Sequence, residues 1–333
     1  MSLSHLRLGD RAVRVNDSDF KISDFKIIVG GLAMLTMNEQ GFKILQLTDI
    51  HIGEAPFNAE DQATFAALKE NIPLVDPDLI VISGDLIWSD GVDRPQRGYQ
   101  ALVDIFNELD YPLAITYGNH DSEQTLDRSA LRKLETGFTH RVTKQHAYVD
   151  PRGKESYTVE IGQAGKITNV LYIFDSGDNA PFDVEGYDWV STEAIAWYEA
   201  THAEYLRTAG QTVDLVFLHI PVPEYANAAT HIVAGKWWEM NPRIASPELN
   251  TGLFAHLRFN QHIAGIFCGH DHDNNFEGRY MGIPLIYGNV SGYNCYGDLP
   301  RGYRVINLTP KTMETVTQTY RGGGTPMQSS WFD

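Results

Sequence analysis

The chain has 333 residues, with 26 Lys and Arg against 43 Asp and Glu, which gives a formal net charge of −17. Its 43% apolar and 11% aromatic residues are typical of a globular protein and exclude a disordered or collagen-like chain. The acidity disfavours nucleic-acid polymers and anionic membranes as partners, because both are bound through clustered Lys and Arg, although a bound cation can reverse the local charge of a site.

The cysteine content and the length of the apolar runs bear on the cellular compartment of the protein and on membrane insertion. Cys268 and Cys295 are too few for a disulfide framework and are typical of a reducing environment. The longest apolar run near the start, residues 27–36, is about half of the roughly 20 residues that a transmembrane helix needs. No compact basic region adjoins this run, so it fits a secretory signal poorly. We therefore predict a cytoplasmic protein with no membrane span.

Regular patterning begins at Phe42, and residues 1–36 are expected to be an N-terminal appendage or leader. Continuous runs of apolar and β-branched residues predict strands that are buried on both faces. These strands are Lys43–Thr48, Asp78–Ser83, Leu113–Tyr117, Val170–Phe174, Leu215–Leu218, Ala264–Cys268, Pro284–Tyr287 and Arg304–Leu308. Thr312–Tyr320 alternates between apolar and polar residues and predicts a more exposed late strand.

Helical patterns lie between these strands. Ala59–Asn71 and Tyr99–Leu109 carry apolar residues at helical spacing, and Ser191–Arg207 begins with a favourable N-cap residue. Strands that alternate with helices predict the α/β class. Neither a linker nor a repeat interrupts the pattern, so residues 37–321 are predicted to form a single domain and residues 322–333 a flexible tail.

Polar residues follow five of the predicted strands at the point where each strand ends. They are Asp49-x-His51, Gly84-Asp85, Gly118-Asn119-His120-Asp121, His219 and Gly269-His270-Asp271-His272. In open α/β sheets ligands bind beyond the carboxyl ends of the strands, so these residues converge if the strands are parallel neighbours. Each motif alone is explained as well by a surface histidine or a turn. Their joint occurrence at five strand ends favours a shared site.

The residue types in this set are those of a transition-metal site. In Asp49-x-His51 and His270-x-His272 the two side chains lie on the same side of an extended chain and can reach one ion. Imidazole, carboxylate and amide oxygen together suit Zn, Mn, Fe or Co, whereas an all-oxygen set would indicate Ca or Mg. The sequence therefore predicts a metal centre with nitrogen and oxygen ligands.

The ordered set of motifs resembles the calcineurin-like metallophosphoesterases. Further segments resemble the purple acid phosphatase-like branch of that superfamily, and they are Phe42–His51, Leu171–Asp178, His219–Tyr225, Gly269–Asn274 and Gly288–Gly302. The resemblance extends roughly from Phe42 to Tyr320. It implies a four-layer αββα sandwich.

The resemblance also implies a two-metal centre and assigns each motif residue a place in it. Asp49, His51 and His272 would hold the first metal, Asn119, His219 and His270 the second, and Asp85 would bridge them. The implied catalytic residues are His120, Asp85 and Asn119. His120 would be either a general acid for the leaving oxygen or an electrostatic clamp on the phosphate, and Asp121 would either orient His120 or cap the following helix.

One position departs from the purple enzymes, which place a metal-ligating Tyr three residues after the bridging Asp. Here that residue is Trp88, and an indole offers an N–H donor but no anionic oxygen. We therefore predict a colourless protein whose first metal need not be ferric. The expected cofactors are two divalent or mixed-valence ions of Mn, Fe, Zn or Co.

Together these features predict a metal-dependent phosphoesterase that hydrolyses monoesters or diesters by direct attack of metal-bound hydroxide. The substrate would be a small phosphate ester or a phosphoprotein. The alternative is a non-catalytic metal-binding scaffold that retains the fold, although a scaffold has no requirement for His120. The resemblance places several residues in loops near the rim of the metal site, namely Tyr225, Tyr293, Asn294, Tyr296 and Arg301. Trp237 and Trp238 would form a hydrophobic wall for a substrate, pack in the core or contact a lid. Arg301 would either contact a phosphate or be solvated.

Overall fold

The structure is a computed structural model that describes residues 34–239 and 244–320 and the backbone of residues 327–330. In these ranges the α-helices are α1 (Ala59–Val75), α2 (Gln96–Leu109), α3 (Arg128–Glu135), α4 (Thr192–Thr208), α5 (Tyr225–Ala228) and α6 (Leu253–Asn260). Two short 3-10 helices are η2 (His120–Ser122) and η3 (Ala229–His231).

The strands form two mixed sheets. Within the described residues the first sheet has six strands, in the order β15 (Met327–Ser330), β14 (Met313–Thr319), β13 (Gly302–Leu308), β2 (Phe42–Leu47), β3 (Leu79–Ser83) and β4 (Leu113–Thr116). The strands β2, β3 and β4 are parallel, and β13 runs antiparallel to β2. The three parallel strands therefore end at the same edge of this sheet.

The second sheet has nine strands in the part of the chain that is described. Its main order is β1 (Leu35–Thr36), β6 (Glu155–Gln163), β7 (Lys166–Ile173), β8 (Val213–Phe217), β10 (Ile263–Cys268), β12 (Ile283–Tyr287), β11 (Glu277–Tyr280) and β9 (Ile232–Ala234), and β5 (Gln145–Val149) pairs with β6. The central strands β7, β8, β10 and β12 are parallel.

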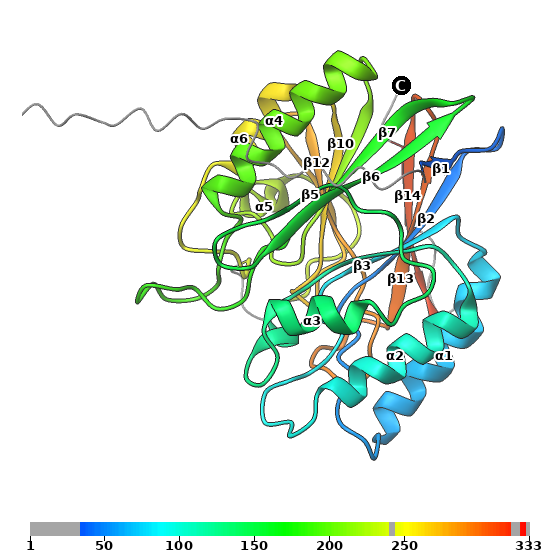
Figure 1. Cartoon of the computed structure of the whole chain (residues 1–333), viewed down its shortest axis with the longest axis vertical. Helices are drawn as coiled ribbons and strands as arrows, with labels where there is room; N and C mark the ends of the chain where they lie inside the picture. The colour runs from blue at the N-terminus through cyan, green and yellow to red at the C-terminus, as the bar shows by residue number, and fades with distance from the viewer. Residues whose placement is uncertain (1–33, 240–243, 321–326, 331–333) are drawn as a thin grey trace, which may run out of the picture.

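Three buried apolar clusters hold four layers together. The central cluster joins Ile44 and Leu79 of the first sheet to Val159, Leu171 and Phe217 of the second. A second cluster packs α1, α2 and α3 on the outer face of the first sheet, and a third packs α4 and α6 on the second. Figure 1 shows the two helical groups on opposite sides of the paired sheets. The predicted four-layer αββα sandwich is confirmed.

Local sequence signals position the helices as predicted, with small differences at their ends. The helix α1 begins at the predicted residue because Asn58 caps it and Asp61 bonds back in a capping box, and it continues four residues past the predicted Asn71. Asp76 ends it in a left-handed conformation. In α4 the predicted cap residue Ser191 accepts a hydrogen bond from the backbone N–H of Ala194.

All nine predicted strands are present, and the late strand β14 alternates in burial as its sequence indicates. The prediction missed β6, although Tyr157, Val159 and Ile161 alternate along it and face the central cluster. The helix α3 was also missed, because it is short and its apolar face is narrow. These omissions do not affect the predicted site residues, because all of those residues follow strands that were predicted.

The predicted ends of the domain lie partly outside the described residues. Residues 1–33 of the expected leader are outside them, whereas Leu35–Thr36 pairs with β6. Of the expected tail, Met327–Ser330 pairs with β14 as β15, and the remaining positions are not described. None of the described helices combines the length and the apolar character that crossing a membrane requires.

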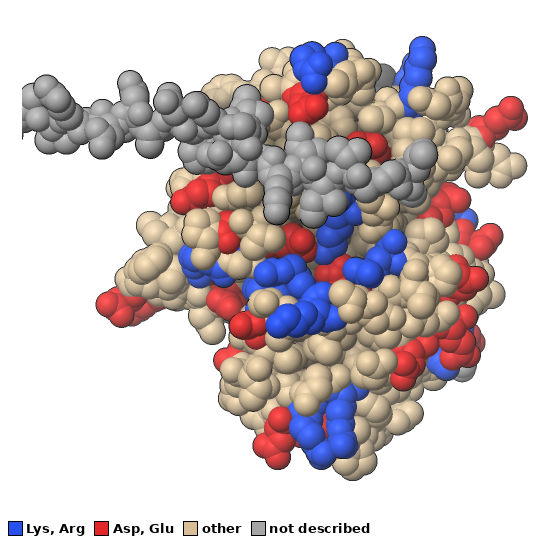
Figure 2. Space-filling model, in the orientation of Figure 1, with Lys and Arg blue, Asp and Glu red and all other residues tan. Residues whose placement is uncertain are grey.

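Charged side chains are mixed on the face shown in Figure 2, where cationic residues gather around α3 and the β5–β6 hairpin. Several of these cations pair with carboxylates. Lys144 contacts Glu135 and Glu155, and Lys154 lies 3.0 Å from Asp188. The charges of these two lysines are therefore compensated by neighbouring carboxylates.

The motifs converge at one end of the two packed sheets. Asp49 and His51 follow β2, Asp85 follows β3, and the other ligand motifs follow β4, β8 and β10. The motif strands were expected to be parallel neighbours, but they belong to two sheets whose carboxyl ends meet. The side-chain amide of Gln46 in β2 donates to the carbonyl of Cys268 in β10 at 3.2 Å, which ties the two sheets together beside the site.

Candidate metal centre

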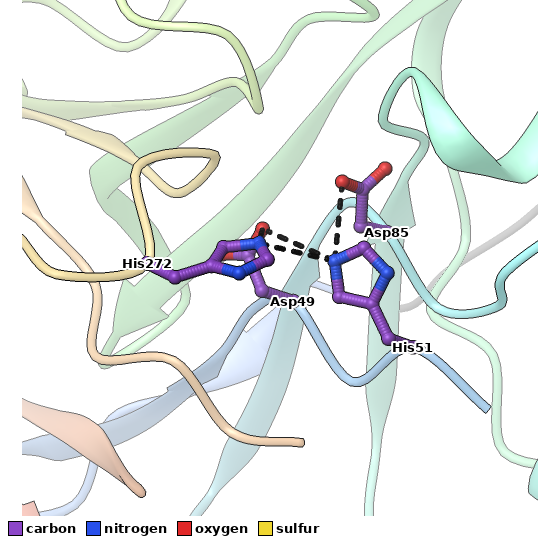
Figure 3. Close-up of side chains that lie close together, drawn as sticks. All are labelled: Asp49, His51, Asp85 and His272. Atoms are coloured by element: carbon purple, nitrogen blue, oxygen red, sulfur yellow. Dashed lines mark hydrogen bonds and ion pairs between the residues drawn. The ribbon is translucent and has the colours of Figure 1, made fainter. Parts of the chain in front are cut away.

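Four buried side chains converge on one point at the end of the sheets. Asp49, His51, Asp85 and His272 each offer a ligand atom within 4.8 Å of the other three, and Figure 3 shows these side chains pointing toward one another. The Nε2 atoms of His51 and His272 are 3.1 Å apart, and Asp49 Oδ1 lies 3.3 Å from His272 Nε2. This arrangement of lone-pair donors suits a metal ion.

A second group shares Asp85 with the first. Asp85, His219 and His270 also meet within 4.8 Å, with Asp85 Oδ2 2.9 Å from His219 Nε2. Among the described residues, Asn119 Oδ1 and His270 Nε2 are buried without a hydrogen-bond partner. Buried polar atoms are normally paired, so these two atoms indicate a ligand that completes the site. A carboxylate common to both groups is the arrangement of a bridged two-metal centre.

The backbone is strained at the ligand positions. Asp49, His51, Asp85 and His270 have φ values of 54°, 52°, 51° and 78°, in the left-handed region that residues other than Gly rarely adopt. Such strain persists only where the surrounding structure enforces it, and it is concentrated at functional sites. Each strained residue turns its side chain out of a strand end and into the shared site.

The glycines of the motifs leave room for the ligands. A Cβ on Gly84, whose φ is +97°, would lie 2.4 Å from the His219 ring. A Cβ on Gly118 would lie 2.1 Å from Asp85 Oδ1. Any side chain at either position would therefore displace a residue of the second group. This explains why Gly precedes Asp85 and Asn119 in the sequence.

Outer contacts hold the imidazoles with Nε2 directed into the site. His219 Nδ1 donates to the carbonyl of Ser83 at 2.9 Å, and His272 Nδ1 lies 3.3 Å from the carbonyl of Tyr296. Thr48 Oγ1 donates to Asp49 Oδ2 at 2.8 Å. Partners of this kind fix the ring orientation of metal-binding histidines.

The ionisation of the site histidines divides into two types. Burial opposes a charge on His219, but the charge and hydrogen bond of Asp85 outweigh it and raise its pKa to about 9. Burial lowers the pKa of His51 and of His270 to about 3 in each case. In the protein alone, His51 and His270 therefore present neutral nitrogens, whereas His219 holds a proton against Asp85.

His120 lies beside the ligand groups without joining them. Its backbone N–H donates to Asp85 Oδ1 at 2.9 Å, while its Nδ1 lies 2.6 Å from Glu123 Oε1. Its side chain is 24% exposed, so a substrate can reach it. Burial disfavours the charged ring, but the hydrogen bond to Glu123 and the carboxylate charges together raise the pKa of His120.

The comparisons with known proteins agree with this geometry. Residues 42–274 match the family described as calcineurin-like phosphoesterase. The chain belongs to this family. Its members use dinuclear metal centres, and the two groups that share Asp85 provide a candidate for one here.

This family member has relatives among curated proteins and solved structures. It is 30% identical to the Arabidopsis thaliana protein named probable inactive purple acid phosphatase 14, over 86% of this chain and 79% of that protein. It is 25% identical to phosphatase DCR2 of Saccharomyces cerevisiae, over 74% of this chain and 46% of that protein. A dimetal phosphatase from Danio rerio has the same fold, with a TM-score of 0.58, 14% identity and coverage of 88% and 100%.

The structure changes the expected role of Asp121. Its carboxylate accepts the backbone N–H groups of Asp85, Leu86 and Ile87 at 2.9–3.1 Å and that of Gly118 at 2.8 Å. It therefore fixes the loop that carries Asp85, and both expected roles are wrong. Glu123, which no sequence motif indicated, is the carboxylate that contacts His120.

Trp88 occupies the position where purple enzymes have a ligating Tyr. Its ring stacks on His120, with centroids 4.5 Å apart and an interplanar angle of 17°. Its Nε1 donates to the carbonyl of Asp90 at 2.9 Å. Trp88 therefore supports the ring of His120 and is not a ligand.

The expected rim residues divide into three kinds. Tyr225 is fully buried and donates to the carbonyl of Ile266, so its expected place at the rim is wrong. Arg301 donates to the carbonyls of Cys295, Tyr296 and Leu299 and holds their loop in place. Tyr293, Tyr296, Trp237 and Trp238 are exposed, and the side-chain amide of Asn294 donates to Asp61.

Proposed function

We propose that this chain is an active phosphoesterase that hydrolyses phosphate monoesters or diesters with two metal ions. The observation that carries the proposal is the place of His120. Its ring is partly exposed, lies 5.1 Å from the ring of His51 and is held by Glu123 on one side and Trp88 on the other, while its backbone N–H donates to Asp85. A group poised in this way serves catalysis, because metal binding alone does not require it.

The residues present fit the two metals that the family uses. Asp49, His51 and His272 would hold one ion, Asn119, His219 and His270 the other, with Asp85 between them. The unpaired Asn119 Oδ1 and His270 Nε2 support this assignment. When bound, such a pair neutralises the charge of a phosphoryl group and lowers the pKa of water toward neutrality. The donor set fits Mn, Fe, Zn or Co.

The residues of the chain would then have separate roles in the hydrolysis of the ester. Asp85 fixes the spacing of the two groups because its carboxylate belongs to both. His120 would donate a proton to the leaving oxygen of the ester, and its raised pKa keeps that proton available near neutral pH. Glu123 and Trp88 would keep the imidazole aimed at the substrate.

The names of the Arabidopsis relatives favour a second candidate, a scaffold that binds metal without turnover. The two candidates differ in what they require of His120. A scaffold gains nothing from a partly exposed imidazole held at 2.6 Å by Glu123, whereas an esterase needs such an acid. We therefore favour the enzyme.

The metal content of the full chain, measured together with its hydrolysis of a monoester and a diester, tests the proposal. Elemental analysis should find two ions per chain, and addition of Mn, Zn, Fe or Co to stripped protein should restore turnover. A fully loaded protein that hydrolyses neither ester would contradict the enzyme and support the scaffold. The same samples should lack a strong visible charge-transfer band, because Trp88 replaces the ligating Tyr.

Two variants separate the proposed roles. Asp85→Asn should lose metal and turnover together, because it weakens both ligand groups. His120→Ala should keep both ions while its turnover falls by roughly 10²- to 10⁴-fold. His140→Ala is a matched control, because His140 is an exposed histidine that pairs with Asp110. If His120→Ala turns over as fast as the control, the catalytic assignment is wrong.

A further inference from the structure

Aromatic rings lie on three of the histidines at the centre. The ring of Tyr296 stacks on His272 with centroids 4.1 Å apart, and Tyr187 meets His270 edge to face at 4.3 Å. Trp88 stacks on His120 in the same way. The three rings come from separate loops, which follow β12, β7 and β3 respectively. They therefore border the centre from several sides.

Exposed aromatic side chains are concentrated at this rim. Six aromatic side chains are exposed in the described part of the chain, and three of them belong to segments beside His272. Tyr296 stacks on its ring, and the backbone of Trp237 and Trp238 pairs with Asn274 and Asp273, which follow it in sequence. The side chain of Tyr296 is 54% exposed although one of its faces covers His272. An exposed apolar group of this kind at a polar site indicates a surface that contacts a ligand.

The charges near the rim do not favour a substrate with many anionic groups. Glu239 accepts the backbone N–H of Asp273, next to His272, at 3.1 Å and adds negative charge there. Arg301 uses its guanidinium on backbone carbonyls, and Lys236 lies over the ring of Trp238 at 3.7 Å. The rim therefore carries aromatic rings with one carboxylate and one ammonium group beside them, and not a cluster of free cations.

We propose that the preferred substrates are phosphate esters whose alcohol carries an aromatic ring, which stacks on Tyr296 and Trp238. This inference rests on the proposed function and specifies its substrate class. Aromatic pairs in proteins are stabilised beyond the effect of area alone, by an amount that corresponds to about a three- to tenfold gain in affinity. Ring stacking acts far from the reacting bond, so the gain should appear in KM and not in kcat.

The test compares esters that differ in the ring alone. 2-Phenylethyl phosphate and 2-cyclohexylethyl phosphate have similar size and similar leaving-group pKa, so the chemistry of bond cleavage is matched. With the full metal-loaded chain, the phenyl ester should have a KM about three- to tenfold lower at equal kcat. Phosphocholine serves as a third substrate, because an ammonium group also binds to aromatic rings. Equal KM values for the first two esters, or a lower KM for phosphocholine, would overturn the inference.

Variants locate the preference on the rim. Tyr296→Leu and Trp238→Leu should each reduce the preference for the phenyl ester, whereas Tyr296→Phe should retain it. Phe259→Leu is the matched control, because Phe259 is an exposed aromatic residue on α6 outside the rim. The metal content of each variant is measured. If Tyr296→Leu loses metal, the ester preference of Trp238→Leu alone tests the assignment. Persistence of the preference in Trp238→Leu and in metal-loaded Tyr296→Leu would refute the assignment.

A binding measurement separates this inference from the proposed function. Calorimetry with 2-phenylethylphosphonate and its cyclohexyl analogue measures the affinity of each compound without any turnover. Tighter binding of the phenyl compound by a protein that hydrolyses no ester would leave the rim assignment intact while the proposed function failed. Turnover of the esters without any difference in affinity between the two phosphonates would refute the rim assignment and leave the proposed function intact.

Discussion

Arg128, the first residue of α3, and Asp175, which follows β7, form a buried two-pronged ion pair between the two halves of the sandwich. Arg128 Nε lies 2.8 Å from Asp175 Oδ2, and its Nη2 lies 3.1 Å from Oδ1. The same guanidinium donates to the carbonyls of Gly118 and Gly177. It therefore fixes the loop that carries Asn119 and His120 against the second sheet.

Replacement of Arg128 by Met should destabilise the protein strongly. Asp175 would remain buried without its partner, and breaking such a pair costs about 3–5 kcal/mol of unfolding free energy. Urea unfolding of the metal-loaded chain measures the loss. The control is Arg152→Met, because the Arg152 side chain is 33% exposed and its partner Asp188 keeps Lys154. Similar losses in the two variants would show that burial of the Arg128 pair has no special effect.

Asp121→Asn should impair metal binding although Asp121 touches no metal. Each carboxylate oxygen accepts two backbone N–H groups, and an amide nitrogen in place of one oxygen would face two donors. We expect a loss of about 2–4 kcal/mol in stability and a lower metal content as the Asp85 loop shifts.

Asp127→Asn is the matched control for this variant. Asp127 caps α3 through one bond to the N–H of Ala130, and Asn is an equally good cap. Elemental analysis and urea unfolding of both variants make the comparison. A full complement of metal in Asp121→Asn would show that the Asp85 loop does not depend on this carboxylate.

Glu123→Gln should weaken His120 as an acid. Burial disfavours the imidazolium, and Glu123 is the main group that raises the pKa of His120 above its usual value. Removal of this carboxylate lowers that pKa, so the alkaline limb of the kcat profile should move to lower pH. We expect a roughly 10- to 100-fold fall in kcat for alkyl esters and a smaller fall for nitrophenyl esters, whose leaving groups need less protonation.

The pH–rate profiles of the wild type and Glu123→Gln on the two ester types provide this measurement. Glu54→Gln is the control, since Glu54 is a carboxylate that bonds to Arg94 and not to a histidine. Unchanged limbs and an equal loss on both ester types would assign Glu123 to folding alone.

Metal affinity should fall as the pH is lowered. The charge of Asp85 overcomes burial and raises the pKa of His219 to about 9, so Nε2 carries a proton below that pH. A metal ion must displace this proton, which weakens binding by up to about tenfold per pH unit and per proton. Competition with a chromophoric chelator between about pH 6 and pH 9 measures the slope. Affinity independent of pH over this range would mean that Nε2 is unprotonated before metal binds.

The sequence indicated which side chains come together at the candidate site because each motif follows a strand that is buried on both faces. A continuous apolar run marks such a strand clearly, and Asp85 or His219 stands where the run stops. The layer order came from the family resemblance. Periodicity alone does not indicate that β2 and β10 belong to different sheets, since each strand reads as equally buried.

The supporting residues could not be predicted in the same way. Asp121 is adjacent to His120 in sequence, yet the turn η2 directs its carboxylate back to the Asp85 loop and brings Glu123 to the imidazole. Which of these two carboxylates reaches the ring depends on one helical turn that no periodic pattern marks. Tyr187 was missed because its contact with His270 joins loops far apart in sequence.

The left-handed conformations of Asp49, His51, Asp85 and His270 bear on how the protein evolves. Each such residue costs on the order of 1–3 kcal/mol, so the four together consume a large share of the margin by which a domain stays folded. Mutations that relax these positions would be tolerated wherever the site was no longer under selection. A lineage that lost its activity should become more thermostable as its ligands drift, and a laboratory selection for heat resistance alone should reproduce that drift.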